Sequence, residues 1–258
     1  MDKQILPIAL FLLIASLLTS HVTAAPLASL NLTDEELSWL ESHPRIYIGT
    51  MDAWPPFNFV ESNGKPTGIG SDIIAALNMR LDGRLRIVPG EWKELYDKVK
   101  ERHLDAIMDI TPKREREAFF NFTKPYLDVP HVIVAQRNTP YLENEDSLKG
   151  KVLALEKGFG NVNYFKQHYP EVTIREYRNT AYALDAVVRG EADAYAGNRG
   201  VAVYLINKEL MTNLQIHGRL SKTGSILTLG TRKDWPILAG ILQKGLDDIS
   251  QEEYLGKL

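Results

Sequence analysis

A short loop after the first predicted strand carries three side chains that could contact a small ligand. Asp52, Trp54 and Phe57 lie in this loop, which two consecutive prolines stiffen. An aromatic ring at Trp54 could stack on the apolar part of a ligand or on a cation. Alternatively, Trp54 packs the loop onto the body of the protein. We predict all three as candidate ligand contacts, with Phe57 mainly in a packing role.

A second segment ends another strand and supplies a partner for an anion. Asp109, Ile110 and Thr111 close a short apolar strand, where backbone amides and the Thr111 hydroxyl can meet a ligand. Arg114 and Arg116 follow in a highly charged run. A carboxylate that is excluded from water needs a fixed charged partner, and a planar guanidinium binds it through two parallel hydrogen bonds. This segment therefore predicts a carboxylate site.

The second half of the chain has two further segments of this kind. Phe159, Gly160 and Asn161 lie between a predicted strand and the start of a helix. The glycine lets the backbone approach a ligand, and free amides at a helix N-terminus favour an anion. The glycine spacing of a dinucleotide-binding fingerprint is absent, and Asn161 alternatively serves only as a helix cap. Asn198 follows another buried strand and offers a neutral amide.

Strands and helices that alternate along the chain must position these segments. The predicted strands cover residues 45–49, 85–88, 105–110, 151–155, 172–176, 192–197 and 226–230. Thr33 and Glu36 form a capping-box pattern before the first helix. Further helices are predicted around 73–77, at 91–102, from about 161, and at 181–189, 201–208 and 236–249. Such alternation predicts an α/β fold with mostly parallel sheets and right-handed crossovers.

Composition and the N-terminus restrict the classes of protein. Residues 1–25 have a charged start, a short apolar run and small residues that suit signal-peptidase cleavage, so export to the periplasm is predicted. The net charge of −3 gives no footprint for nucleic acid. The absence of cysteine excludes a lipoprotein anchor, thiol chemistry and thiolate metal sites. No metal or cofactor is predicted.

Several stretches, in this order, resemble the bacterial extracellular solute-binding proteins of family 3, the type that recognises polar amino acids. They are YIGTMDAWPPFNFVESNGKPTGIGSDI, HLDAIMDITPKREREAFFNFTKPY, LKGKVLALEKGFGN, GEADAYAGN and RKDWPILAGILQKGL. Together they cover almost all of the chain after the leader. Within the family, TKPY and RKDWPIL look most like the periplasmic domains of two-component sensor kinases.

The resemblance implies a two-lobed periplasmic binding protein of type II with two crossover strands as its hinge. Lobe 1 would hold residues 42–135 plus 225–258, and lobe 2 residues 136–224. A small polar ligand, an amino acid or a related carboxylate, would lie in the cleft between them, where open α/β sheets place their ligands. Hinge closure would then serve uptake with the membrane subunit of an ABC transporter, or signalling through an attached sensor kinase.

In the family, one arginine after the Thr111 turn binds the ligand carboxylate. Arg114 has the family's usual offset from Thr111, whereas Arg116 has the usual offset to the downstream FNFTKPY motif. We choose Arg116, because the downstream motif fixes the register of the strand. Lys113 and Glu115 are expected to be solvated.

Asn198 departs from the family pattern. Amino-acid binders of this family usually have an aspartate here that pairs with the ammonium group of the ligand. An asparagine can accept a hydrogen bond from an ammonium but supplies no charge, which opens the site to carboxylates without an amine. Asp52 could alternatively supply the missing charge from the other lobe.

An enzyme is the alternative reading, because a few relatives of this fold are dehydratases that act on cyclic dicarboxylates. Glu156, at the end of a strand, could then act as an acid. However, the sequence has no nucleophile elbow and no metal-ligand spacing, and its six histidines are scattered. A binding function is therefore predicted.

Overall fold

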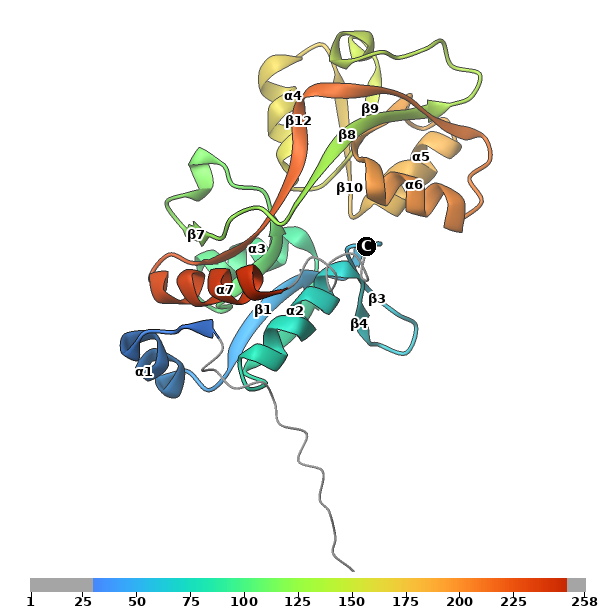
Figure 1. Ribbon diagram of the computed structural model, residues 1–258. Helices are drawn as coiled ribbons and strands as arrows, with labels where there is room; N and C mark the ends of the chain where they lie inside the picture. The colour runs from blue at the N-terminus through green and yellow to red at the C-terminus, as the bar shows by residue number, and fades with distance from the viewer. Residues whose placement is uncertain (1–29, 250–258) are drawn as a thin grey trace, which may run out of the picture.

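The computed structural model describes residues 30–249, apart from the side chains at positions 222 and 223. These residues form two α/β lobes joined by two long strands (Figure 1). The predicted leader, residues 1–25, lies outside the described residues. Within residues 30–249, no helix combines the length and the apolar character needed to cross a membrane.

Lobe 1 is built on three parallel strands, with β1 between the other two. The strands are β1 (Ile46–Met51), β5 (Leu85–Gly90) and β6 (Ala106–Ile110). The helices are α1 (Asp34–Ser42), α2 (Ile69–Arg80), α3 (Trp92–Lys100) and α7 (Pro236–Asp248). Shorter elements are β2 (Ala53–Trp54), β3 (Asn58–Val60), β4 (Pro66–Thr67), β7 (Phe120–Phe122) and the 3-10 helix η2 (Arg114–Arg116).

Lobe 2 repeats this design, with β9 between two parallel neighbours. Its strands are β9 (Val152–Glu156), β10 (Thr173–Tyr177) and β11 (Ala194–Asn198). Its helices are α4 (Gly160–His168), α5 (Thr180–Val188), α6 (Arg199–Lys208) and the 3-10 helix η3 (Glu145–Leu148). The predicted α/β alternation is therefore confirmed in both lobes.

Two antiparallel strands, β8 (Leu127–Gln136) and β12 (Leu214–Arg232), run side by side between the lobes (Figure 1). The far end of β8 pairs with β11 of lobe 2, and the far end of β12 pairs with β6 of lobe 1. These are the two crossover strands that the resemblance implies. The exact division into 42–135 plus 225–258 and 136–224 stays a prediction. The pairing of His131 with Asn198 favours a boundary a few residues before 136.

Alternate residues of the central strands pack on opposite faces, as the period of a strand requires. In β6, Ala106 and Met108 pack with α1, α2 and α7, whereas Ile107 packs with α3. In β9, Leu153 packs with α4, and Ala154 packs with α5 and α6. Both faces of each sheet are therefore covered, and polar side chains gather at the carboxyl ends of the strands.

The predicted capping box at the start of α1 is also confirmed. The Thr33 hydroxyl accepts a hydrogen bond from the Glu36 N–H at 3.2 Å, and the Glu36 carboxylate accepts one from the Thr33 N–H at 2.7 Å. The pair satisfies two of the amide groups that a helix start leaves without partners.

Candidate ligand-binding cleft

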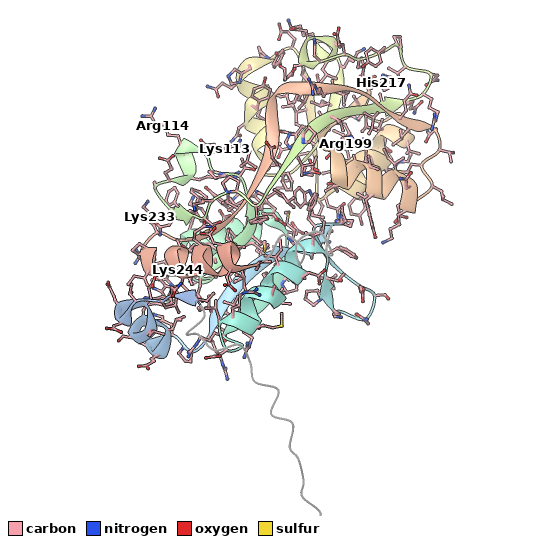
Figure 2. The ribbon with its side chains drawn as sticks, in the orientation of Figure 1. Lys113, Arg114, Arg199, His217, Lys233 and Lys244 are labelled. Atoms are coloured by element: carbon pink, nitrogen blue, oxygen red, sulfur yellow. The ribbon has the colours of Figure 1, made fainter. Side chains whose placement is uncertain are left out.

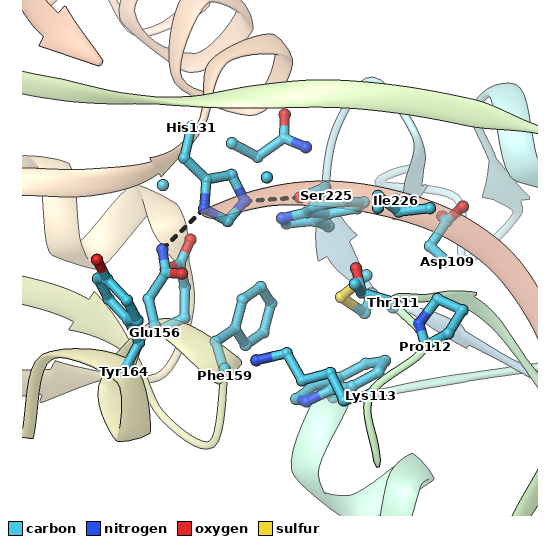
Figure 3. Close-up of a pocket in the computed structure, with 18 of the residues that line it drawn as sticks. Asp109, Thr111, Pro112, Lys113, His131, Glu156, Phe159, Tyr164, Ser225 and Ile226 are labelled. Atoms are coloured by element: carbon cyan, nitrogen blue, oxygen red, sulfur yellow. Dashed lines mark hydrogen bonds between the residues drawn. The ribbon is translucent and has the colours of Figure 1, made fainter. Parts of the chain in front are cut away.

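A cleft of about 280 Å³ lies between the lobes, and residues from both lobes line it (Figure 3). It opens at the carboxyl ends of β1 and β6 in lobe 1 and of β9 and β11 in lobe 2. Most of the predicted site residues line it: Trp54, Asp109, Thr111, Arg116, Phe159, Gly160, Asn161 and Asn198. The structure thus brings together segments that are up to half the chain apart.

Arg116 is a buried cation in this cleft, only 8% exposed. Its Nη1 donates a hydrogen bond to the Thr111 carbonyl oxygen at 2.8 Å, and its guanidinium lies 5.3 Å from the ring of Trp92. Burial lowers the pKa of Arg116, but a guanidinium stays charged at neutral pH. No carboxylate among residues 30–249 forms an ion pair with it. Its charge is therefore available to a ligand.

Lys113 is a second cation of the cleft, and the expectation that it is solvated was wrong. Its side chain extends across the cleft toward Phe159 (Figure 3). Its Nζ occupies the place that a Cβ on Gly160 would fill, at the first turn of α4. Burial lowers the pKa of Lys113, and the neighbouring charge of Arg116 lowers it further. No sequence pattern predicts this position of Lys113, because it depends on how lobe 2 sits against lobe 1.

Arg114 lies outside the cleft. It is exposed at the start of η2, and Figure 2 shows its side chain pointing away from both lobes. The structure therefore brings only Arg116 of the two candidate arginines into the cleft. That Arg116 binds a carboxylate stays a prediction.

Three other predicted contacts do not line the main cleft. Ile110 is fully buried in the core. Phe57 is buried, and its ring packs 4.8 Å from the ring of Trp54. Asp52 lies 3.8 Å from Arg178 of lobe 2 in an ion pair at the rim. Because Asp52 lies at the rim and does not line the cleft, it is poorly placed to supply a missing charge there.

Trp54 combines the two roles that the sequence left open. It is 4% exposed and packs against Phe57, yet it also lines the cleft, with Phe159 of lobe 2 at 6.4 Å. Its Nε1 has no hydrogen-bond partner among the described residues. This indole N–H is a spare donor at the cleft wall.

Asn161 is not the cap of α4, so the capping alternative is wrong. Phe159 takes the N-cap position, and Asn161 lies one residue inside the helix. Its Nδ2 donates to the Ala196 carbonyl oxygen at 3.0 Å and lies 3.1 Å from Nδ1 of His131. This amide therefore holds α4 against β11 and β8.

His131 on β8 lines the cleft, although no sequence pattern distinguishes it from the other scattered histidines. Its Nε2 lies 2.8 Å from the Ser225 hydroxyl on β12, so it joins the two crossover strands (Figure 3). Because Asn161 offers an N–H to Nδ1, the ring accepts at Nδ1 and carries its proton on Nε2. Burial lowers the pKa of His131 to about 4, so the ring is neutral at pH 7.

Asn198 caps α6, which settles the orientation of its amide. Its Oδ1 accepts a hydrogen bond from the Val201 N–H at 3.1 Å. The remaining polar group of the side chain is therefore the Nδ2 donor. It is buried, since Asn198 is only 3% exposed, and it has no partner among the described residues. The oxygen that was expected to receive an ammonium is already used.

Two buried carboxyl groups also line the cleft. Asp109 accepts hydrogen bonds from the Tyr126 hydroxyl at 2.6 Å and from the Asn58 amide, and burial raises its pKa to about 7. Burial also raises the pKa of Glu156, whose Oε1 accepts hydrogen bonds from two hydroxyl groups, those of Thr180 and Tyr195. Neither carboxyl group forms an ion pair within residues 30–249. No group of His, Cys, Asp and Glu side chains in this part of the chain is placed to hold a metal ion.

The lobes contact each other around the rim of the cleft. The Trp92 Nε1 donates to the Gly158 carbonyl oxygen at 3.2 Å, and Arg178 pairs with Glu91 at 2.8 Å. On another side, the rings of Phe59 and Tyr204 lie 6.2 Å apart. A solute in the cleft would therefore be enclosed by both lobes.

Residues 46–258 match the family of bacterial extracellular solute-binding proteins, family 3. The chain belongs to this family. Among its relatives, the virulence sensor protein BvgS of Bordetella pertussis is 25% identical over 219 residues, which are 84% of this chain and 18% of that protein. The ABC transporter arginine-binding protein 1 of Escherichia coli is 29% identical over 175 residues, 67% of this chain and 69% of that protein. The chain thus spans about a fifth of the sensor relatives.

Solved structures of other proteins share the fold. A histidine kinase sensor domain with similarity to periplasmic binding proteins has a TM-score of 0.78 at 23% identity, over 84% of this chain and 95% of that one. The periplasmic VFT2 domain of Bordetella pertussis BvgS has a TM-score of 0.77 at 24% identity, over 87% and 96%. The two-lobed periplasmic-binding-protein fold is therefore confirmed. The relatives are binding proteins and sensors, so the dehydratase-like alternative has no support.

Proposed function

We propose that this chain is a periplasmic binding domain that closes around a small solute with a carboxylate group. The observation that carries the proposal is the pair of cations, Arg116 and Lys113, that line the cleft without a carboxylate partner in the described chain. A buried charge without a partner is costly, and an anionic ligand offsets that cost. The predicted bidentate contact of Arg116 supplies the main anchor.

Lobe 2 supplies neutral donors at the cleft. The Nδ2 of Asn198 has no protein partner, and the backbone N–H groups of Gly160 and Asn161 lie in the first turn of α4, where a helix leaves amides free. A solute that contacts both lobes stabilises the closed arrangement over the open one by its differential affinity. Hinge motion at β8 and β12 follows from this proposal.

The proposed roles of binding are signalling and uptake, and the family has relatives of both kinds. In the first role, the partner is an attached sensor kinase. In the second, it is the membrane subunit of an ABC transporter. Residues 1–25 are the proposed cleavable leader for export to the periplasm.

A thermal-shift screen with amino acids and organic acids tests the proposal. A carboxylate present at about 100 times its dissociation constant is expected to add about 2.7 kcal/mol to the free energy of unfolding. The primary amides of the same acids are the matched controls and are expected to give no shift, because they offer no charge to Arg116. The proposal fails if no acid stabilises the protein, or if acids and amides stabilise it equally.

A further inference from the structure

The charged groups around the cleft do not balance. Arg116 and Lys113 bring two positive charges from lobe 1. Lys113 reaches Gly160 of lobe 2, whereas Arg116 lies over the ring of Trp92 in lobe 1. One ligand carboxylate at Arg116 would leave the Lys113 ammonium partly buried and unpaired. Because burying an unpaired charge is unfavourable, a ligand with a second negative group would bind more favourably.

The surroundings of Lys113 provide the other half of an anion site. The first turn of α4 lies directly beside its Nζ. The Nδ2 of Asn198 and the Nε1 of Trp54 are buried donors on the cleft wall, and both lack a partner among the described residues. These groups can only donate hydrogen bonds, and an anion is the ligand that accepts from all of them.

A ligand ammonium, by contrast, would find a single carboxyl oxygen without a hydrogen-bond partner among the described cleft residues, the Oε2 of Glu156. The Oδ1 of Asn198 caps α6, and both oxygens of Asp109 accept hydrogen bonds from neighbouring side chains. Asp52 pairs with Arg178 outside the cleft. Two hydroxyl groups donate to the Oε1 of Glu156, and its Oε2 has no partner among the described residues. Burial favours the protonated form of this carboxyl group, which offers no negative charge to an ammonium. A protonated Glu156 is a further hydrogen-bond donor.

We propose that the ligand is a small dicarboxylate without an amino group, with one carboxylate at Arg116 and the second at Lys113, beside the first turn of α4. This inference rests on the proposed function, because it assumes that the first carboxylate binds at Arg116. It adds the class of solute and makes Lys113 a specificity-determining residue. Lys113 from lobe 1 and Asn198 from lobe 2 then contact the ligand from opposite sides.

Calorimetry with two matched sets of solutes tests the inference. Each set keeps the chain length constant: succinate, butyrate and 4-aminobutyrate form one set, and glutarate, valerate and glutamate form the other. The amine-free dicarboxylate is expected to bind at least about tenfold more tightly than either of its counterparts. The monocarboxylates and 4-aminobutyrate have only one carboxylate, and glutamate brings an ammonium next to two cations. The inference is overturned if the amino compound or the monocarboxylate binds as tightly as the dicarboxylate.

Three variants locate the second carboxylate. Lys113→Met is expected to weaken the dicarboxylate by about tenfold to 100-fold while changing monocarboxylate affinity little. Asn198→Asp keeps the cap of α6 but adds a negative charge, and it is expected to weaken the dicarboxylate by at least about 30-fold. Lys93→Met is the matched control, because Lys93 contacts Gly158 of lobe 2 but pairs with Asp97 outside the cleft. This control is expected to bind like the unmodified protein.

The outcomes separate this inference from the proposed function. If Lys113→Met has no effect while Arg116→Ala abolishes binding, a single carboxylate binds and the dicarboxylate inference is wrong. Improved dicarboxylate affinity in Asn198→Asp would also overturn it. If neither acids nor amino acids bind at all, the proposed function fails together with the inference. Circular dichroism confirms that each variant is folded.

Discussion

Arg116→Ala is expected to weaken carboxylate binding by about 30-fold to several thousand-fold, which corresponds to roughly 2–5 kcal/mol. The guanidinium lies buried in the cleft on a hydrogen bond to the Thr111 carbonyl oxygen, and no carboxylate of the described chain pairs with it. Removal of this charge leaves a desolvated ligand carboxylate without its main partner. Arg116→Lys is also expected to bind poorly, because an ammonium cannot form two parallel hydrogen bonds.

Arg114→Ala is the matched control for this prediction. Arg114 is two residues away, carries the same charge and is exposed outside the cleft. Its removal is expected to cost well under about 1 kcal/mol in binding. Calorimetry with the acid that gives the largest thermal shift measures all three variants. Loss of binding in Arg114→Ala with retention in Arg116→Ala would show that the wrong arginine was chosen.

Acidification is expected to cost the protein about 3 kcal/mol of stability through His131 alone, between pH 6.5 and about 4. The ring is neutral in the folded protein because burial lowers its pKa to about 4, whereas in the unfolded chain its pKa is 6.5. Below pH 6.5 the unfolded chain therefore binds a proton that the folded protein does not. The stabilisation is complete above pH 6.5 and is lost as the pH falls toward 4.

The pKa shift of Asp109 changes the stability in the opposite direction to that of His131, over an overlapping pH range. Burial raises its pKa from 3.8 to about 7, so its contribution is complete below pH 3.8 and is lost as the pH rises toward 7. This corresponds to about 4 kcal/mol. The unmodified protein is therefore expected to show only a weak net dependence from these two groups, and variants are needed to separate them.

Urea unfolding at pH 7 and pH 4 separates the two effects. Relative to His131→Gln, the unmodified protein is expected to lose about 3 kcal/mol on going from pH 7 to pH 4. Relative to Asp109→Asn, it is expected to gain about 4 kcal/mol over the same change. All other titrating groups are common to each pair, so they cancel in the comparison. If the stability difference between His131→Gln and the unmodified protein is the same at both pH values, His131 is not held neutral by burial.

The elements that could be predicted from the sequence are those with a recognisable local pattern of polar and apolar residues. The capping box at Thr33 predicted the start of α1, the alternation of residues 45–49 predicted β1, and the short apolar run of residues 105–110 predicted β6. The family motif downstream of Arg116 also predicted which arginine lies in the cleft. In each case, the deciding information lies within a few residues of the position in question.

The crossover strands lack such a pattern, so their extent was missed. β8 contains Pro130, and β12 begins near Leu214, well before the predicted start at 226. β12 also shifts register between Ile216 and Arg219, and again before Gly224. These irregularities break the alternation from which a strand is predicted, and pairing between distant segments compensates for them.

The missed residues of the cleft depend on contacts between distant segments. His131 reaches Ser225 and Asn161, which are 94 and 30 residues away in the sequence. Lys113 enters the cleft because Gly160 of the other lobe leaves room for its ammonium. No spacing in the sequence encodes either contact, so only the assembled lobes reveal these two groups.

Small-angle X-ray scattering of the chain, with and without the acid that stabilises it most, tests the central claim most directly. If a carboxylate solute binds between the lobes and contacts both, the radius of gyration is expected to decrease at saturation. Arg116→Ala at the same solute concentration should show no decrease. An unchanged radius for the unmodified protein at saturation would contradict binding by closure of the cleft.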